Sequence, residues 1–216
     1  MKPKLVIFDM DGTMLDTERL SLAGLMEAAR VMGHEMPREL FEEMIGHSAA
    51  YCRELVRTRY GDDFDLDKAH DIHTEYVDEY FKNHGVPIKP GLFELLDKLT
   101  AAGIKKCVAT STAKERATHK LTLAKLANYF ETIVGGDEVL HSKPDPEIFL
   151  KAAGFCGVTP ENCLVLEDSP AGTEGAIRAG MPVILIPDIA ELPDDVRAKA
   201  LRVCSDLFEV AELLSV

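Results

Sequence analysis

Two carboxylates, Asp9 and Asp11, stand one residue apart directly after the apolar run 5–8. An uninterrupted apolar run predicts a strand buried on both faces, as in the centre of a parallel sheet. Open α/β sheets bind ligands at the carboxyl ends of their strands, where this acid pair would lie. Carboxylates this close repel each other unless a cation or a shared proton intervenes, and a hard cation such as Mg2+ is the expected counterion. The alternative to a functional site is that an aspartate at the end of the strand only caps the next turn, where Gly12 lets the chain bend.

Hydroxyl groups follow a second predicted strand. Residues 106–110 predict that strand, and Ser111 and Thr112 come just before a helical segment that starts near residue 113. A hydroxyl beside the free N–H groups of a helix N-terminus can bind a phosphate. The alternative is that Ser111 or Thr112 only caps the helix.

Lys143 stands on a constrained loop. Pro144 favours an extended conformation at the residue before it, and Pro146 suits the first position of a helix. From such a loop the ammonium group of Lys143 could reach the acid pair and neutralise phosphate oxygens. The alternative is a solvated surface lysine, the usual state of this residue type.

A second acid pair, Glu167 and Asp168, ends another apolar run at 163–166. Ser169 and Pro170 then fit the N-cap and the first position of a helix. If this strand neighbours the first one, Asp168 completes an oxygen site and Glu167 supports it from outside. The alternative is an acidic cap that the helix dipole favours.

The order of these pieces is more specific than any one of them. An acid pair, a hydroxyl, a lysine and a second acid pair, each after a predicted strand, resemble the four motifs of the haloacid dehalogenase (HAD) superfamily from Lys4 to about Pro187. The stretches 9–13, 15–17 and 166–172 are similar to the branch with a helical cap after the first motif. That branch includes β-phosphoglucomutases and many small sugar-phosphate phosphatases.

The resemblance implies a role for each candidate residue. Asp9 would be the nucleophile that forms an aspartyl-phosphate, and Asp11 would be general acid and then general base. Asp11 would have to be protonated when the substrate binds. The other implied roles are Mg2+ coordination by Asp9, Asp168 and the backbone carbonyl of Asp11, phosphate binding by Ser111, Thr112 and Lys143, orientation of Lys143 or of a metal-bound water by Glu167, and shaping of the turn by Gly12 and Thr13.

Composition narrows the class of protein. The 216 residues are 46% hydrophobic and 28% charged, and the net charge of −13 disfavours binding to nucleic acid or anionic membranes. The five cysteines form no C-x-x-C pair and are odd in number, which predicts reduced thiols and a cytoplasmic location. No apolar run approaches the ~18 residues of a membrane span, and no signal peptide is expected. A small phosphorylated metabolite is the expected partner, and nothing requires more than a monomer.

The chain alternates between two kinds of pattern. Residues 17–84 are wholly helical in pattern, with helices expected from about 22 to 32 and at 37–45, 48–60 and 66–83, and with His70 and His73 as solvated helix residues. After Pro87, helices alternate with apolar strands near 104–110, 132–135, 163–167 and 182–186. The predicted fold is α/β: a Rossmann-like, doubly wound parallel sheet core (1–16 and 87–216) with an inserted helical-bundle cap (17–86), hinged near 15–18 and 84–90.

Departures from the mutase pattern favour hydrolysis over phosphoryl transfer. The mutases have a basic residue directly after a glycine of the cap, but here residues 46–50 include no arginine, and the first one is Arg53. Glu115 would repel a distal phosphate, and Ser21 stands where the mutases have a hinge histidine. A β-phosphoglucomutase-type transfer remains the alternative. A dehalogenase would not need Asp11, and a phospho-receiver module would not explain the cap.

Overall fold

The computed structural model of the chain describes residues 3–61, 64–189 and 192–214. The strands are β1 (Leu5–Phe8), β2 (Lys105–Ala109), β3 (Thr132–Val134), β4 (Cys163–Glu167), β5 (Val183–Leu185) and β6 (Arg202–Val203). The α-helices are α1 (Glu18–Val31), α2 (Arg38–Glu42), α3 (Ala49–Tyr60), α4 (Leu66–His84), α5 (Leu92–Ala101), α6 (Lys114–Leu123), α7 (Glu147–Cys156), α8 (Pro170–Arg178), α9 (Asp194–Lys199) and α10 (Leu207–Leu213). Short 3-10 helices are η1 (Ala127–Tyr129), η2 (Gly136–Glu138) and η3 (Pro160–Asn162).

The strands form one parallel sheet in the order β3-β2-β1-β4-β5-β6. β1 is central, and Phe8 pairs with Val108 of β2 on one side and with Leu166 of β4 on the other. The carboxyl ends of these three strands therefore lie side by side. Because the chain order runs outward in both directions from β1, this edge is the switch point at which open α/β sheets bind ligands.

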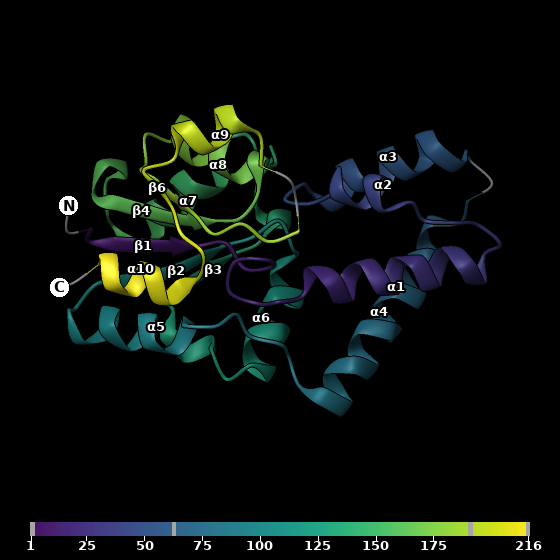
Figure 1. Cartoon of the computed structure of the whole chain (residues 1–216), viewed down its shortest axis with the longest axis horizontal. Helices are drawn as coiled ribbons and strands as arrows, with labels where there is room; N and C mark the ends of the chain where they lie inside the picture. Colours follow the sequence, from purple (N-terminus) through teal and green to yellow (C-terminus); the bar gives the residue numbers. More distant parts are fainter. Residues whose placement is uncertain (1–2, 62–63, 190–191, 215–216) are drawn as a thin grey trace.

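Helices cover both faces of the sheet, with α5, α6 and α10 on one face and α7, α8 and α9 on the other (Figure 1). Side chains of β1 alternate between the two layers because successive residues of a strand point to opposite faces. Val6 and Phe8 pack with Leu95 of α5, whereas Leu5 and Ile7 pack with the α7 layer. This arrangement confirms the predicted doubly wound parallel sheet.

The helices α1–α4 lie beyond the carboxyl ends of the strands, on the side to which β1 points (Figure 1). They bury a small apolar cluster of their own that includes Ala28, Met36, Leu40 and Val56. α2 is shorter than the predicted helix over 37–45, because the chain turns after Glu43 toward Gly46, whose φ is +79°. This turn brings the segment around Gly46 against the sheet domain.

Two neighbouring connections join these helices to the rest of the chain. The backbone N–H of Asp16 in the first donates to the carbonyl of Pro87 in the second at 3.0 Å. Asp188 follows β5, and its side chain is 2% exposed. Its carboxylate forms ion pairs with Arg19 at 2.8 Å and with Lys89 at 2.7 Å. One buried carboxylate thus ties both connections to the sheet domain.

The sequence pattern predicts the strands and helices up to residue 186 and none beyond it. β6 pairs with β5 at the sheet edge, and α10 packs on α5 through Leu207 and Val210. β6 has two residues and α9 has six, which is too short for a periodic pattern. Within the described residues, none of the helices is long and apolar enough to cross a bilayer.

Candidate active site

Three carboxylates meet at the carboxyl ends of β1 and β4. Asp9 follows β1, Glu167 ends β4 and Asp168 follows it, so the pairing of the two strands brings the three side chains together. One carboxylate oxygen from each residue lies within 4.8 Å of the others. Their exposed fractions are only 7%, 0% and 2%, so three negative groups share a site that excludes most water.

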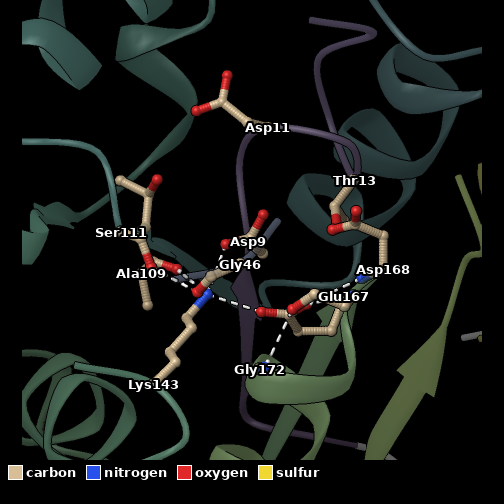
Figure 2. Close-up of polar contacts among 12 residues, drawn as sticks. Asp9, Asp11, Thr13, Gly46, Ala109, Ser111, Lys143, Glu167, Asp168 and Gly172 are labelled. Carbon is tan, nitrogen blue, oxygen red and sulfur yellow. Dashed lines mark hydrogen bonds and ion pairs between the residues drawn. The ribbon is translucent and has the colours of Figure 1, made fainter. Parts of the chain in front are cut away.

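Lys143 is the buried cation of this cluster. Its Nζ donates to Asp9 Oδ1 at 2.5 Å, to Glu167 Oε1 at 2.6 Å and to the carbonyl of Ala109 at 3.3 Å (Figure 2). Burial disfavours the ammonium charge, but Asp9 and Glu167 outweigh burial and raise the pKa of Lys143 above its ordinary value. A lysine that is 2% exposed is therefore held charged between two carboxylates from different strands.

The cluster carries more negative charge than Lys143 balances. Burial raises the pKa of Asp9 to about 7 against the opposing effect of Lys143. Burial together with the charges of Glu167 and Asp9 raises the pKa of Asp168 well above its usual range. Both shifts mean that a further positive charge at this position would be favourable.

The residues around Asp168 fit a small cation with oxygen ligands. Its Oδ1 accepts a hydrogen bond from Thr13 at 2.9 Å, whereas its Oδ2 is buried without a hydrogen-bond partner in the described part of the chain. A Cβ at Gly12, where φ is +86°, would lie 2.2 Å from that Oδ2, so only glycine leaves the oxygen accessible. A hard cation such as Mg2+ suits this donor set because it often binds one or two carboxylates together with phosphate oxygens.

Glu167 also shapes the loop that leads into α8. Its Oε2 accepts hydrogen bonds from the backbone N–H of Asp168, the backbone N–H of Ser169 and the hydroxyl of Ser169, each at 2.9 Å. The Ser169 hydroxyl accepts in turn a hydrogen bond from the N–H of Gly172 at 3.0 Å, so Ser169 is the N-cap of α8, as predicted. Gly172 is required here, because a Cβ would lie 1.7 Å from Glu167 Oε1.

Asp11 lies outside this cluster. Figure 2 shows its carboxylate turned away from Asp9 and Lys143. It accepts hydrogen bonds from Thr17 at 2.5 Å, Thr112 at 2.8 Å and Lys120 at 2.6 Å. Burial would raise the pKa of Asp11, but the charge of Lys120 and these hydrogen bonds lower it below its ordinary value. In this conformation Asp11 is ionised, whereas the resemblance implied a protonated Asp11 at substrate binding.

The two hydroxyl residues have different partners. Ser111 donates to the backbone carbonyl of Gly46 at 2.9 Å, which links the loop after β2 to the helical insertion. Thr112 donates to Asp11 rather than pointing at Asp9. Neither caps α6, whose N-cap is Ala113. The segment around Gly46 fits tightly, since a Cβ there would lie 2.4 Å from the Ser169 hydroxyl.

Several residues near the site were missed from sequence. Thr17 and Lys120 contact Asp11, and Glu18 is electrostatically coupled to Asp9, Asp11 and Asp168. Lys120 gave no local signal, because it lies on α6 well after Ser111 and meets Asp11 only through the fold.

The expectation for His73 was wrong. His70 is exposed, but His73 is half-buried, and its Nε2 lies 3.0 Å from the hydroxyl of Ser21. The signal was present in the sequence, because His73 lies one helical turn from Ala69 and one from Val77, and both of these are buried.

Comparison with known proteins gives the same class of protein as the resemblance of the four sequence motifs. A family model described as haloacid dehalogenase-like hydrolase matches residues 6–186. Protein CbbY from Rhodobacter capsulatus is 32% identical over 212 residues, which cover 94% of this chain and 93% of that protein. A phosphorylated carbohydrates phosphatase from Thermotoga maritima is 32% identical over 180 residues, with 82% and 81% covered. The crystal structure of CbbY from Rhodobacter sphaeroides in complex with phosphate has a TM-score of 0.83 at 25% identity and covers 96% of both chains. The chain therefore belongs to the haloacid dehalogenase-like hydrolases.

Substitution of Gly172 by alanine tests the close approach of α8 to Glu167. Gly172→Ala should lower the free energy of unfolding by about 1–3 kcal/mol, because the new methyl group overlaps a buried carboxylate that cannot move without breaking its bonds. Gly154→Ala is the matched control: Gly154 lies in α7, and apart from its chain neighbours and the backbone of its own helix no described atom lies within 4 Å of the place that its methyl group would take, so this variant should be stabilised by about 0.5–1 kcal/mol. Urea unfolding of both variants measures the difference, and equal stabilities would contradict the packing described.

Proposed function

We propose that this protein is a Mg2+-dependent phosphatase that hydrolyses small phosphate monoesters through an aspartyl-phosphate intermediate. The observation that carries the proposal is the environment of Asp9. Its carboxylate accepts a hydrogen bond from the buried Lys143 and lies in one cluster of oxygens with Asp168, and Oδ2 of Asp168 has no hydrogen-bond partner in the described residues. The name of the Thermotoga maritima relative, a phosphatase of phosphorylated carbohydrates, supports sugar or polyol phosphates as substrates.

The proposed reaction has two displacements at phosphorus. A carboxylate oxygen of Asp9 bonds to phosphorus in line with the ester oxygen, and the bond from phosphorus to the alcohol oxygen breaks. The leaving alkoxide keeps the electron pair and takes a proton from Asp11. Water then attacks the phosphorus, its proton passes to Asp11, and the bond to Asp9 breaks. Inorganic phosphate leaves, and the Asp9 carboxylate is restored.

The negative charges of nucleophile and ester have to be balanced. Mg2+ held by the carboxylates of Asp9 and Asp168 and by the backbone carbonyl of Asp11 would neutralise part of this charge. Lys143 supplies a fixed positive charge beside Asp9, and Glu167 holds that lysine in place. Thr13 orients the Asp168 carboxylate through its hydrogen bond.

Substrate binding requires the insertion to move. We infer that residues 17–86 act as a cap, because the Ser111 hydroxyl that would bind a phosphate oxygen now donates to the Gly46 carbonyl of that segment. The bond has to break when the phosphate arrives, together with the bond from Thr112 to Asp11. Asp11 must also rotate away from Lys120, whose charge lowers its pKa, so that it can take up a proton from solvent and reach the ester oxygen. The two connections at Asp16 and Pro87 are the natural hinge for this opening.

The charges favour hydrolysis over the mutase alternative. Transfer between two positions of one sugar needs a second phosphate to be bound. Arg53, the first arginine after Gly46, pairs with Asp67 at 2.7 Å, and Lys114 pairs with Glu138 at 3.0 Å. Both cations are therefore occupied by acidic partners.

A phosphate-release screen tests the proposed function. Sugar, polyol and nucleoside monophosphates are incubated with the protein and Mg2+, and inorganic phosphate is measured. The expected result is Mg2+-dependent release that Asp9→Asn abolishes, because an amide cannot attack phosphorus. Asp195→Asn is the control, since Asp195 is 72% exposed on α9 and should leave the rate unchanged. Formation of glucose 6-phosphate from β-glucose 1-phosphate would support the mutase instead.

The role of Asp11 predicts a dependence on the leaving group. Asp11→Asn should slow alcohol release from a sugar phosphate by about 10²–10⁴-fold, because the poor leaving group needs a proton. Release of nitrophenolate from p-nitrophenyl phosphate should slow much less, because this leaving group departs as an anion. Single-turnover measurement of alcohol release isolates the first displacement from the later attack of water. Equal losses for the two esters would show that Asp11 is not the acid.

A further inference from the structure

The positive charges around the candidate active site already have acidic partners. In the part of the chain that the structure describes, these pairs are Lys143 with Asp9 and Glu167, Lys120 with Asp11, Arg116 with Asp78, and Lys114 with Glu138. A substrate with a second phosphate or a carboxylate would need one of these cations for itself. The arrangement therefore offers little to an anionic group other than the phosphate that reacts.

The start of α1 lies directly beside the site. Thr17, the residue before α1, donates to Asp11 at 2.5 Å, and Glu18 is the first residue of the helix. Burial and the charges of Asp11 and Asp9 raise the pKa of Glu18 to about 8, although Lys120 opposes the shift. No hydrogen bond or ion pair in the described residues engages the Glu18 carboxyl group, so it is available to a ligand.

Ser21 and His73 extend this face of α1 away from the strands. Ser21 lies three residues after Glu18, on the same side of the helix, and its hydroxyl is 3.0 Å from Nε2 of His73 on α4. Gly24 permits this approach, because a Cβ there would already lie 3.0 Å from the His73 ring. Burial, followed by the charges of neighbouring cations that include Lys120, lowers the pKa of His73 to about 4.

These three side chains suit hydroxyl groups. A neutral imidazole and a serine hydroxyl can each donate and accept, and a carboxyl group accepts from an alcohol. We propose that Glu18, Ser21 and His73 determine specificity by binding the hydroxyl groups of the alcohol part of the substrate, so that the enzyme selects monophosphates of neutral polyhydroxy alcohols over esters with a second anionic group. This inference rests on the proposed phosphatase function.

Two esters of nearly equal size test the selection. Glycerol 3-phosphate and 3-phosphoglycerate differ mainly by a hydroxymethyl group in place of a carboxylate, and p-nitrophenyl phosphate carries no alcohol hydroxyls. For the wild-type enzyme, kcat/KM should be at least about tenfold higher for glycerol 3-phosphate than for 3-phosphoglycerate. A hydrogen bond between neutral groups contributes about 0.5–1.5 kcal/mol, which corresponds to roughly 2–10-fold in binding, and the unpaired carboxylate of 3-phosphoglycerate costs more than one lost bond.

Glu18→Ala should therefore lower the ratio of kcat/KM for glycerol 3-phosphate over p-nitrophenyl phosphate by about 2–10-fold, mainly through KM. Glu75→Gln, an exposed position on α4, is the control and should leave both activities unchanged. An unchanged ratio in Glu18→Ala would overturn the inference. So would a preference for 3-phosphoglycerate that disappears in Lys120→Met, because Lys120 would then be an anion site. Failure of the wild type to hydrolyse p-nitrophenyl phosphate with Mg2+ would instead overturn the proposed function itself.

Discussion

The buried ion pairs of Lys143 are the constraint on which the site depends. A charged lysine that is 2% exposed is tolerable only when acidic partners balance it, and here the partners are Asp9 from the end of β1 and Glu167 from the end of β4. Loss of one partner from such a pair typically costs about 3–5 kcal/mol, because the remaining charge is left buried and unpaired. Lys143 therefore holds together two strand ends and the loop before α7. Gly172 serves the same contact by leaving room for Glu167.

The same interaction separates the two acids of the first motif. Asp9 faces Lys143, whereas Asp11 faces Lys120, with Gly12 at a φ of +86° directly after them. The two carboxylates thus have different cations as partners in this conformation, and Asp9 shares Lys143 with Glu167. The charge that remains unbalanced is that of Asp168 with Asp9, and the pKa values of both groups are raised first by burial and then by neighbouring carboxylates. This deficit of positive charge explains how the site could bind a divalent cation in addition to the lysine that is fixed there.

The sequence predicted those parts of the molecule that local patterns determine. The apolar runs predicted the strands up to residue 186 and their parallel arrangement, and the proline positions located the loop of Lys143 and the start of α8. Side-chain direction was not predictable, because it depends on contacts between distant segments. The turn of Asp11 toward Lys120 and the contact of Ser111 with Gly46 span 109 and 65 residues. Glu18 lies beside the site because the turn that joins β1 to α1, with a hydrogen bond from the N–H of Leu15 to the carbonyl of Met10, brings the start of α1 next to Asp11.

The central claim is that Lys143 leaves the carboxylates of Asp9, Glu167 and Asp168 short of positive charge, which a metal ion would supply. Thermal unfolding with and without Mg2+ tests it directly. The wild-type protein should be stabilised by Mg2+, by about 2.7 kcal/mol at a concentration of 100 times Kd. Asp168→Asn should be at least as stable as the wild type without metal, because it removes an unbalanced buried charge, and Mg2+ should not stabilise it. Equal stabilisation of both proteins by Mg2+ would contradict the account.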